Sequence, residues 1–267
     1  NVFRDIKERI KVMTVNDGMC RYSDMQRRYY KHLSRSYQLS MDRCVGNYEV
    51  HQAYPYKEYL LERYSGAYEK CLDFGCGMGR LMAQMLPPFD MVVGVDISEN
   101  NISHAKKYLS EEGIDDNKYD LFEVSGTGCD IDVDYKFDFA YSTICLQHIC
   151  VHDTRQNIFK DIYDLLKKGG QACFQMGTGY FPKVTRYPSD GSVAFQGDAT
   201  WKDNHYDVAG TNSERDVFIP SAQDFPMIEE DFNEIGYEDV VFDIKESPHP
   251  ENELYHSSWL FIHCSKY

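Results

Sequence analysis

The chain has 267 residues, of which 42% are apolar, and a formal net charge of −15. This length suits one large domain, or one domain with a cap, and is enough to bury a full core. The acidic balance argues against nucleic acid or an anionic membrane surface as a partner, because both need clustered Lys and Arg. No apolar run approaches 18 residues and no secretory signal is present, so we expect no membrane partner.

The nine cysteines include no Cys-x-x-Cys pair, and several fall inside predicted strands, where a free Cys packs as a small hydrophobe. This usage favours a reduced, cytoplasmic location. The chain begins at Asn1 rather than Met, which fits a domain cut from a longer polypeptide. Other domains of such a polypeptide are therefore among the expected partners.

Residues 1–66 carry apolar side chains at near-helical spacing, which predicts a first helix from Val2 to Met13 and a second over 23–39. Pro55 is expected to open a third helix, over 56–64, before a stop at Ser65-Gly66. We expect this region to form an N-terminal helical cap. Its tyrosines could equally serve as a packed helical layer, and no functional residue stands out among them.

From Lys70 onward, strand and helix patterns alternate regularly, and this order indicates a doubly wound α/β sheet. The first five strands are predicted over residues 70–74, 91–95, 119–124, 137–142 and 171–176. Between them we expect helices over 79–86, from a Ser98 cap to Gly113, and from an Asp153 cap to Gly169-Gly170 with Lys167-Lys168 in its last turn. Further on, we expect a helix from an Asp224 cap through Pro226 to Gly236, then strands near 239–245 and 258–264.

A glycine-rich loop follows the first predicted strand, in the sequence Asp73-Phe74-Gly75-Cys76-Gly77-Met78-Gly79. Glycines let a strand turn sharply into a helix while a ligand approaches the bare backbone. About 20 residues later the second strand ends at Asp96, where a carboxylate can accept hydrogen bonds from both hydroxyls of a ribose. A dinucleotide-binding loop would have its third glycine one position later, where this chain has Arg80.

This Asp-x-Gly-x-Gly-x-Gly loop and Asp96 resemble those of the class I S-adenosylmethionine-dependent methyltransferases, over residues 68–176 and more loosely in the tail. The resemblance implies a seven-stranded, mostly parallel sheet that ends in a hairpin with an antiparallel strand. It also implies S-adenosyl-L-methionine as cofactor, S-adenosyl-L-homocysteine as product, and N-terminal helices that fold over the cofactor. The cofactor-binding residues are then expected to be Asp73, Gly75, Cys76, Gly77, Gly79, Asp96, Ile97, Thr127, Gly128 and Ser142. In the family an acid often binds the adenine amino group, but here Thr127 has that place and Asp130 is the nearest substitute.

The end of the fourth strand is the expected place for methyl-transfer chemistry, because ligands of a parallel sheet bind at the carboxyl ends of its strands. Ser142, Cys145, Leu146 and His148 should face the methionine end of the cofactor. An alcohol acceptor benefits from a general base, and we predict His148 for this role, with His205 as the second candidate. His148, His152 and Asp153 resemble a metal-ligand group, but no third ligand lies nearby, so we expect no metal.

Residues 177–222 show no sustained period, and a segment of this kind is often functional. We therefore expect residues 67–267 to form the methyltransferase domain, with 177–222 as a substrate-binding insert. Its rings and acids suit a sugar, which favours O-methylation of a polyhydroxylated acceptor such as a sugar unit of a glycan, although these rings could merely pack a lid. Alternatives are N-methylation of a small amine, a non-catalytic cofactor-binding domain, or an oxidoreductase. The predicted substrate-binding residues are Tyr180, Trp201, His205 and Tyr206.

Overall fold

A computed structural model describes residues 2–41, 53–179, 185–186, 193–194, 199–206, 216–217, 219–248 and 257–267, with only the backbone at 2–15, 185–186 and 193–194. The helices of these residues are α1 (Val2–Leu33), α2 (Tyr37–Met41), α4 (Tyr56–Leu61), α5 (Arg80–Met85), α6 (Glu99–Glu111), α7 (His152–Leu165) and α8 (Phe225–Ile235). Single 3-10 turns lie at η2 (Asp116–Lys118), η3 (Leu146–His148) and η4 (Ala222–Asp224).

The central sheet has seven strands in the order β3-β2-β1-β4-β5-β9-β8. They are β1 (Lys70–Phe74), β2 (Met91–Asp96), β3 (Tyr119–Glu123), β4 (Phe137–Ser142), β5 (Leu166–Thr178), β8 (Glu238–Glu246) and β9 (Ser258–Ser265). The first five are parallel, whereas β9 pairs antiparallel with both β5 and β8. A separate small hairpin joins β6 (Thr185–Arg186) to β7 (Val193–Ala194). The seven-stranded, mostly parallel sheet with a terminal antiparallel hairpin is therefore confirmed.

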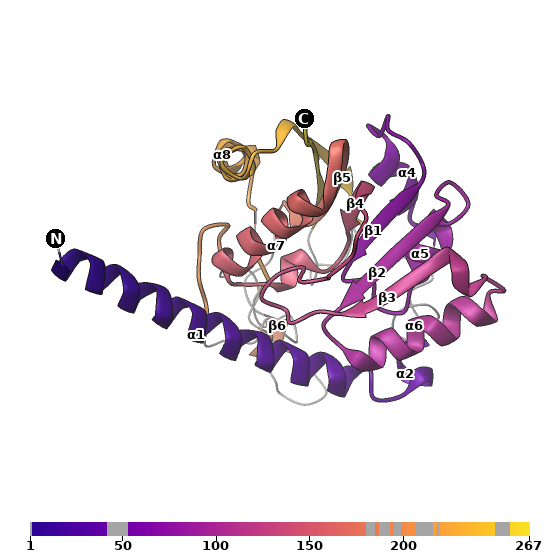
Figure 1. The fold of residues 1–267 in the computed structure, drawn as a ribbon, viewed down its shortest axis with the longest axis horizontal. Coiled ribbons are helices and arrows are strands. Elements are labelled where there is room, and N and C mark those ends of the chain that lie inside the picture. Colours follow the sequence, from indigo (N-terminus) through magenta and orange to yellow (C-terminus); the bar gives the residue numbers. More distant parts are fainter. Residues whose placement is uncertain are drawn as a thin grey trace.

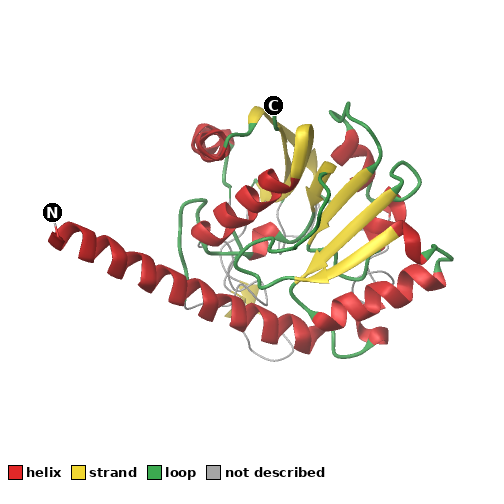
Figure 2. Ribbon diagram, viewed as in Figure 1, coloured by secondary structure: helices red, strands yellow, loops and turns green. Residues whose placement is uncertain are grey.

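Helices cover both faces of the sheet, so the fold has three layers (Figures 1 and 2). Side chains of successive strand residues point to opposite faces, and β1 shows the result. Leu72 and Phe74 join a core with α7 and α8, whereas Cys71 joins a second core with α4, α5 and α6. Because all the parallel strands run in one direction, the chain segments that follow β1, β2, β3 and β4 meet at one edge of the sheet.

Several predicted helix ends are confirmed. The Ser98 side chain accepts a hydrogen bond from the Asn101 N–H at the start of α6, as an N-cap should. Gly236 ends α8 in the left-handed conformation at φ 114°. Asp224 is the N-cap residue of α8, as predicted, but its side chain makes no cap bond to that helix and instead forms a capping box with Ser221 around η4.

The predicted pair of N-terminal helices is wrong, because one continuous helix, α1, runs from Val2 to Leu33. In Figure 1 its amino-terminal part projects from the rest of the molecule, and its carboxyl-terminal part lies near the ends of β2 and β3. Gly18 does not break the helix, and packing explains its presence. A Cβ there would lie 3.0 Å from the ring of Tyr206. No described helix is both long and apolar enough to cross a membrane.

The predicted ends of α7 also need correction. The N-cap is Val151, and the Asp153 side chain instead accepts a hydrogen bond from the Tyr206 hydroxyl at 2.8 Å. At the other end α7 stops at Leu165, so Lys167 and Gly169 belong to β5. Lys167 pairs with Asp138 and Glu69 rather than with the helix dipole.

Candidate functional site

The loop after β1 makes its turn with three glycines at positive φ: Gly75 at 79°, Gly77 at 54° and Gly79 at 78°. The N–H groups of Gly75 and Cys76 both donate to the Val95 carbonyl of β2, which fixes the loop on the sheet edge. A Cβ on Gly75 would lie 2.4 Å from Cys145 Sγ, so the close approach of the segment after β4 requires glycine here.

Gly77 differs from its neighbours because a Cβ built on it meets nothing within 4 Å. Its partly exposed backbone therefore borders open space at the carboxyl edge of the sheet. Its N–H donates to Asp96 Oδ2 at 3.0 Å, which links the glycine loop to the acid that ends β2. A backbone without a side chain, next to a fixed carboxylate, leaves room for a nucleoside.

Asp96 is buried and its carboxylate is oriented by several donors, including the Ile97 N–H. Besides Gly77, the Ser98 N–H and the Asn101 side-chain amide donate to Oδ1, at 2.8 and 3.1 Å. Burial raises the pKa of Asp96, and these hydrogen bonds oppose that effect. The carboxylate is thus held in a single orientation, which is the condition for recognising two ribose hydroxyls at once.

Asp73 lies in β1 directly before the glycine loop and is almost completely buried. The Tyr141 hydroxyl of β4 donates to its Oδ2 at 2.9 Å. Burial raises the pKa of Asp73 to about 7, although Tyr141 and Arg80 both act to lower it. This carboxyl therefore changes charge near neutral pH, and a positively charged ligand nearby would favour its ionised form.

The loop after β3 is built largely from its own polar groups. Asp130 accepts from the Ser125 N–H at 2.9 Å, and Asp161 of α7 accepts from the Cys129 N–H at 2.8 Å. Thr127 contacts Ser125 through its hydroxyl, and Asn157 donates to its carbonyl. Asp130 thus helps to shape this loop. Its part in adenine recognition remains a prediction.

His148 lies in η3, immediately beyond β4, and its Nδ1 is 2.7 Å from Asp216 Oδ1. Asp216 lies 68 residues further along the chain, in the segment that returns from the insert. Burial lowers the pKa of His148, but the Asp216 carboxylate outweighs burial and raises this pKa above its ordinary value.

The turn between β4 and η3 contains a strained residue, because Ile144 has φ 49°, an unusual value for a β-branched side chain. Its N–H donates to the side-chain carbonyl of the buried Gln175 at 2.7 Å, and Gln175 also donates to Gln147 at 3.2 Å. Strain of this kind persists only where the surroundings hold it, and it is common at functional sites. Leu146 is buried in the core, whereas Cys145 is partly exposed.

Helix α1 borders the same edge of the sheet and contributes residues that the sequence did not reveal. The Tyr22 hydroxyl and the Gln26 amide donate to the His148 carbonyl at 3.3 and 3.1 Å. Arg27 donates to the carbonyls of Val124 and Ser125 after β3. Gln26 and Arg27 follow Tyr22 by four and five positions, so all three lie on one side of the helix, but the sequence does not indicate which loops that side meets.

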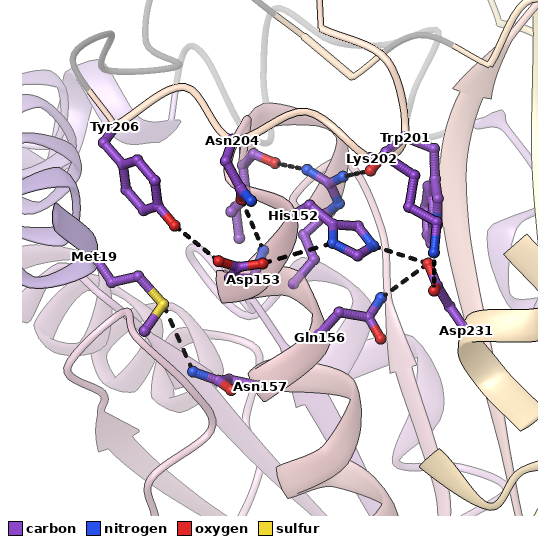
Figure 3. A network of polar contacts seen from close by, with 12 residues as sticks. Met19, His152, Asp153, Gln156, Asn157, Trp201, Lys202, Asn204, Tyr206 and Asp231 are labelled. Carbon is purple, nitrogen blue, oxygen red and sulfur yellow. Dashed lines mark hydrogen bonds and ion pairs between the residues drawn. The ribbon is translucent and has the colours of Figure 1, made fainter. Parts of the chain in front are cut away.

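Part of the insert is fastened by a polar network that joins α7 and α8 (Figure 3). Asp231 of α8 accepts hydrogen bonds from Trp201 Nε1 at 2.5 Å, His152 Nε2 at 2.8 Å and Gln156 at 3.3 Å, and it pairs with Lys202. Trp201 is only 1% exposed and stacks on Phe159 in the core. The predicted role of Trp201 as a stacking surface for substrate therefore has to be replaced by a structural one.

The other predicted insert residues have different surroundings. Tyr206 is partly buried against Met19 of α1 and donates to Asp153 (Figure 3). His205 is partly buried, 3.6 Å from Asp203. Tyr180 lies outside the described residues. His152 and His148 turn to different acids, and no three potential metal-ligating side chains converge within the described part of the chain.

Comparisons with known proteins agree with this geometry. Residues 71–170 match the family model described as a methyltransferase domain. The ubiquinone biosynthesis O-methyltransferase of Stutzerimonas stutzeri (strain A1501) is 26% identical over 126 residues, which are 47% of this chain and 52% of that enzyme. An S-adenosylmethionine-dependent methyltransferase from Clostridium acetobutylicum ATCC 824 superposes with TM-score 0.52 and 15% identity, over 100% of this chain and 99% of that one. The DhpI–SAH complex gives TM-score 0.57 and 17% identity over 93% and 97%.

Residues 71–170 thus match a methyltransferase domain, and the chain has the fold of S-adenosylmethionine-dependent methyltransferases. It spans about half the length of the curated relatives that it matches. S-adenosylmethionine is the cofactor of the methyltransferases that share this fold, and the residues present fit it. The open face of Gly77 would accept the nucleoside, and Asp96 would hold its ribose.

The structure brings together most of the predicted cofactor residues at one sheet edge. Ser142 Oγ donates to the Phe74 carbonyl at 2.8 Å, so the ends of β4 and β1 are tied to each other. Ile97 and Gly128 lie in the segments that follow β2 and β3. Asp216 was missed because it lies in the predicted insert, where no helix or strand pattern singles it out, and only its 2.7 Å contact with His148 reveals it.

Proposed function

We propose that this chain is an S-adenosylmethionine-dependent methyltransferase that methylates a hydroxyl group of a small polar acceptor. The observation that carries the proposal is the position of His148. It follows β4 at the edge of the sheet that also holds Gly77 and Asp96, and it has a carboxylate on its Nδ1. A histidine with an acid partner next to a cofactor site is a common arrangement for a general base.

When bound, the cofactor supplies a methyl group on a sulfonium, which becomes a neutral thioether when the methyl leaves. The residues of the chain then have two tasks. The loop after β1 and Asp96 hold the nucleoside, and such positioning can supply roughly 7–11 kcal/mol of the barrier. His148 takes the proton of the acceptor hydroxyl as its oxygen bonds to the methyl carbon, which contributes about 10²–10⁴-fold.

For the acceptor we propose a polyhydroxylated molecule such as a sugar unit of a glycan. Two rings and two acids lie close to the amino-terminal end of α7: Tyr206, His205, Asp153 and Asp203. They offer ring faces and carboxylates to the hydroxyl groups of an acceptor. The similarity to an enzyme named as an O-methyltransferase also favours oxygen over nitrogen. Methylation of a small amine is the second candidate, favoured by the same carboxylates, which would attract a cation.

We further propose that residues 1–66 act as an N-terminal cap and 177–222 as a substrate insert on a methyltransferase domain of residues 67–267. The contacts of Tyr22, Gln26 and Arg27 with the segments after β3 and β4 support the first part. The return of the insert to His148 through Asp216 supports the second.

The test is transfer of a labelled methyl group from S-adenosylmethionine to a panel of sugars and amines. We expect a hydroxyl acceptor to become labelled and His148→Ala to lower its turnover roughly 10²–10⁴-fold. S-adenosylhomocysteine affinity should change less than about twofold by calorimetry, since His148 is not in the cofactor loop. His32→Ala, an exposed histidine of α1, is the matched control and should leave turnover unchanged. Tight S-adenosylhomocysteine binding without any labelled acceptor would instead support a non-catalytic cofactor-binding domain.

A further inference from the structure

We propose that Asp216 is a positioning residue for His148, which holds the imidazole with its proton on Nδ1 and leaves Nε2 as the basic nitrogen. The part of this proposal that concerns catalysis rests on the proposed function. The part that concerns the tautomer stands on the geometry alone.

The contact itself defines the donor. An ionised carboxylate can only accept hydrogen bonds, so at 2.7 Å from Asp216 Oδ1 the Nδ1 of His148 must carry the proton. The Asp216 side chain is 7% exposed and that of His148 is 24% exposed, so the acid is buried whereas the imidazole ring is partly accessible. A neutral imidazole held this way has its free lone pair on Nε2.

Both partners are also fixed through their backbones. The Val217 N–H, next to Asp216, donates to the carbonyl of Gln147, next to His148, at 2.7 Å. Tyr22 and Gln26 of α1 hold the His148 carbonyl, and the Tyr22 hydroxyl accepts from the Cys150 N–H at 2.9 Å. The ring and the acid are therefore brought together by β4, α1 and the returning segment before any ligand arrives.

The charge environment gives Asp216 a defined effect. The titratable groups near this pair include Tyr22 and Tyr30 on α1 and Cys145 after β4. Burial raises the pKa of each of these three groups, and the Asp216 charge raises that of Tyr30 further. All three are therefore neutral near pH 7, and Asp216 supplies the negative charge that the imidazole meets. That charge favours the imidazolium that would form when Nε2 takes a proton.

The direct test is nitrogen NMR of the full chain labelled with ¹⁵N at histidine, recorded across pH without cofactor or acceptor. In the wild-type chain we expect His148 to show a protonated Nδ1 and an unprotonated Nε2 in its neutral form. In Asp216→Asn we expect the His148 pKa to fall by about one pH unit or more, because the opposite charge is gone. Asp216→Glu should recover part of this shift.

Asp153→Asn is the matched control. It removes a carboxylate beside His152 that has no contact with His148, so the His148 pKa should move by less than about 0.3 pH units. If a labelled acceptor is available, the acidic limb of the turnover profile should shift with the ring pKa in Asp216→Asn.

A wild-type His148 with its proton on Nε2, or a His148 pKa that is the same in Asp216→Asn, would overturn the proposal. The wild-type measurement decides the tautomer even if the Asn variant does not fold. These results are independent of methyl transfer. The expected tautomer and pKa shift, combined with normal turnover in His148→Ala, would retain the pairing and reject only the proposed base.

Discussion

A single added methyl group at Gly77 should separate the cost of the backbone conformation from the loss of the cofactor site. Gly77 has φ 54°, and a Cβ built there meets nothing within 4 Å. Gly77→Ala therefore places a methyl group in the space assigned to the nucleoside without any clash inside the protein. An alanine in the left-handed region costs about 1–2 kcal/mol, and the stiffer unfolded chain offsets roughly 0.4–1 kcal/mol of this. The expected loss of stability is about 1 kcal/mol.

Gly77→Ala should also weaken cofactor binding, and this second effect is separate from the loss of stability. Overpacking a filled site by one methyl group costs about 1–3 kcal/mol, which corresponds to a roughly 5- to 150-fold weaker affinity. Gly113→Ala is the matched control, because Gly113 follows α6 with φ 73° and also has nothing within 4 Å. It should lose similar stability and keep wild-type affinity.

The assay is titration calorimetry with S-adenosylhomocysteine, with thermal unfolding of the same three proteins. If Gly77→Ala and Gly113→Ala lose equal stability and both bind S-adenosylhomocysteine like the wild type, the open space at Gly77 does not hold the nucleoside. A Gly77→Ala protein far less stable than Gly113→Ala would show that its environment is not open.

Two further predictions follow from buried acids. The pKa of Asp73 is about 7, so its carboxyl is largely protonated at pH 6 and ionised at pH 8. Calorimetry should therefore show that the affinity for the cationic S-adenosylmethionine rises from pH 6 to pH 8. A rise of the same size in Asp73→Asn would contradict the assignment of this pH dependence to Asp73. Burial opposes ionisation of Asp231, but hydrogen bonds from His152, Lys202 and Trp201 outweigh it and lower its pKa to about 2. The stability that depends on this charge is present above the ordinary pKa near 4 and is lost as pH falls toward 2. Asp231→Ala should lower the free energy of unfolding by roughly 3–5 kcal/mol at pH 7, because it leaves buried donors unpaired. It should also make stability depend less on pH in the acid range. If urea unfolding gives a free energy within about 1 kcal/mol of the wild type, the network does not have this role.

The sheet and the cofactor loop could be predicted because their signals are local. The strand from Lys70 to Phe74 and the glycines after it are read from consecutive residues, and Asp96 stands at a spacing that the alternation of strand and helix fixes. Ser98 and Gly236 were likewise recognisable, because helix caps depend on only a few neighbouring residues.

The rest of the site depends on contacts between distant segments. His148 meets Asp216 across 68 residues and Tyr22 across 126, and no periodicity records either pairing. Trp201 was misjudged for the same reason. In a segment without pattern its ring was assigned to substrate binding, but Trp201 is buried in the core and donates to Asp231 on α8. Asp153 was assigned to a helix cap because its actual partner, Tyr206, is equally remote in sequence.

The most direct test of the account is a crystal structure of the chain grown with S-adenosylhomocysteine. The account predicts that the ribose hydroxyls lie within hydrogen-bond distance of the Asp96 carboxylate, with the nucleoside against Gly77. A ligand bound elsewhere, or a crystal of the chain in which this edge of the sheet stays empty at saturating ligand concentration, would contradict it.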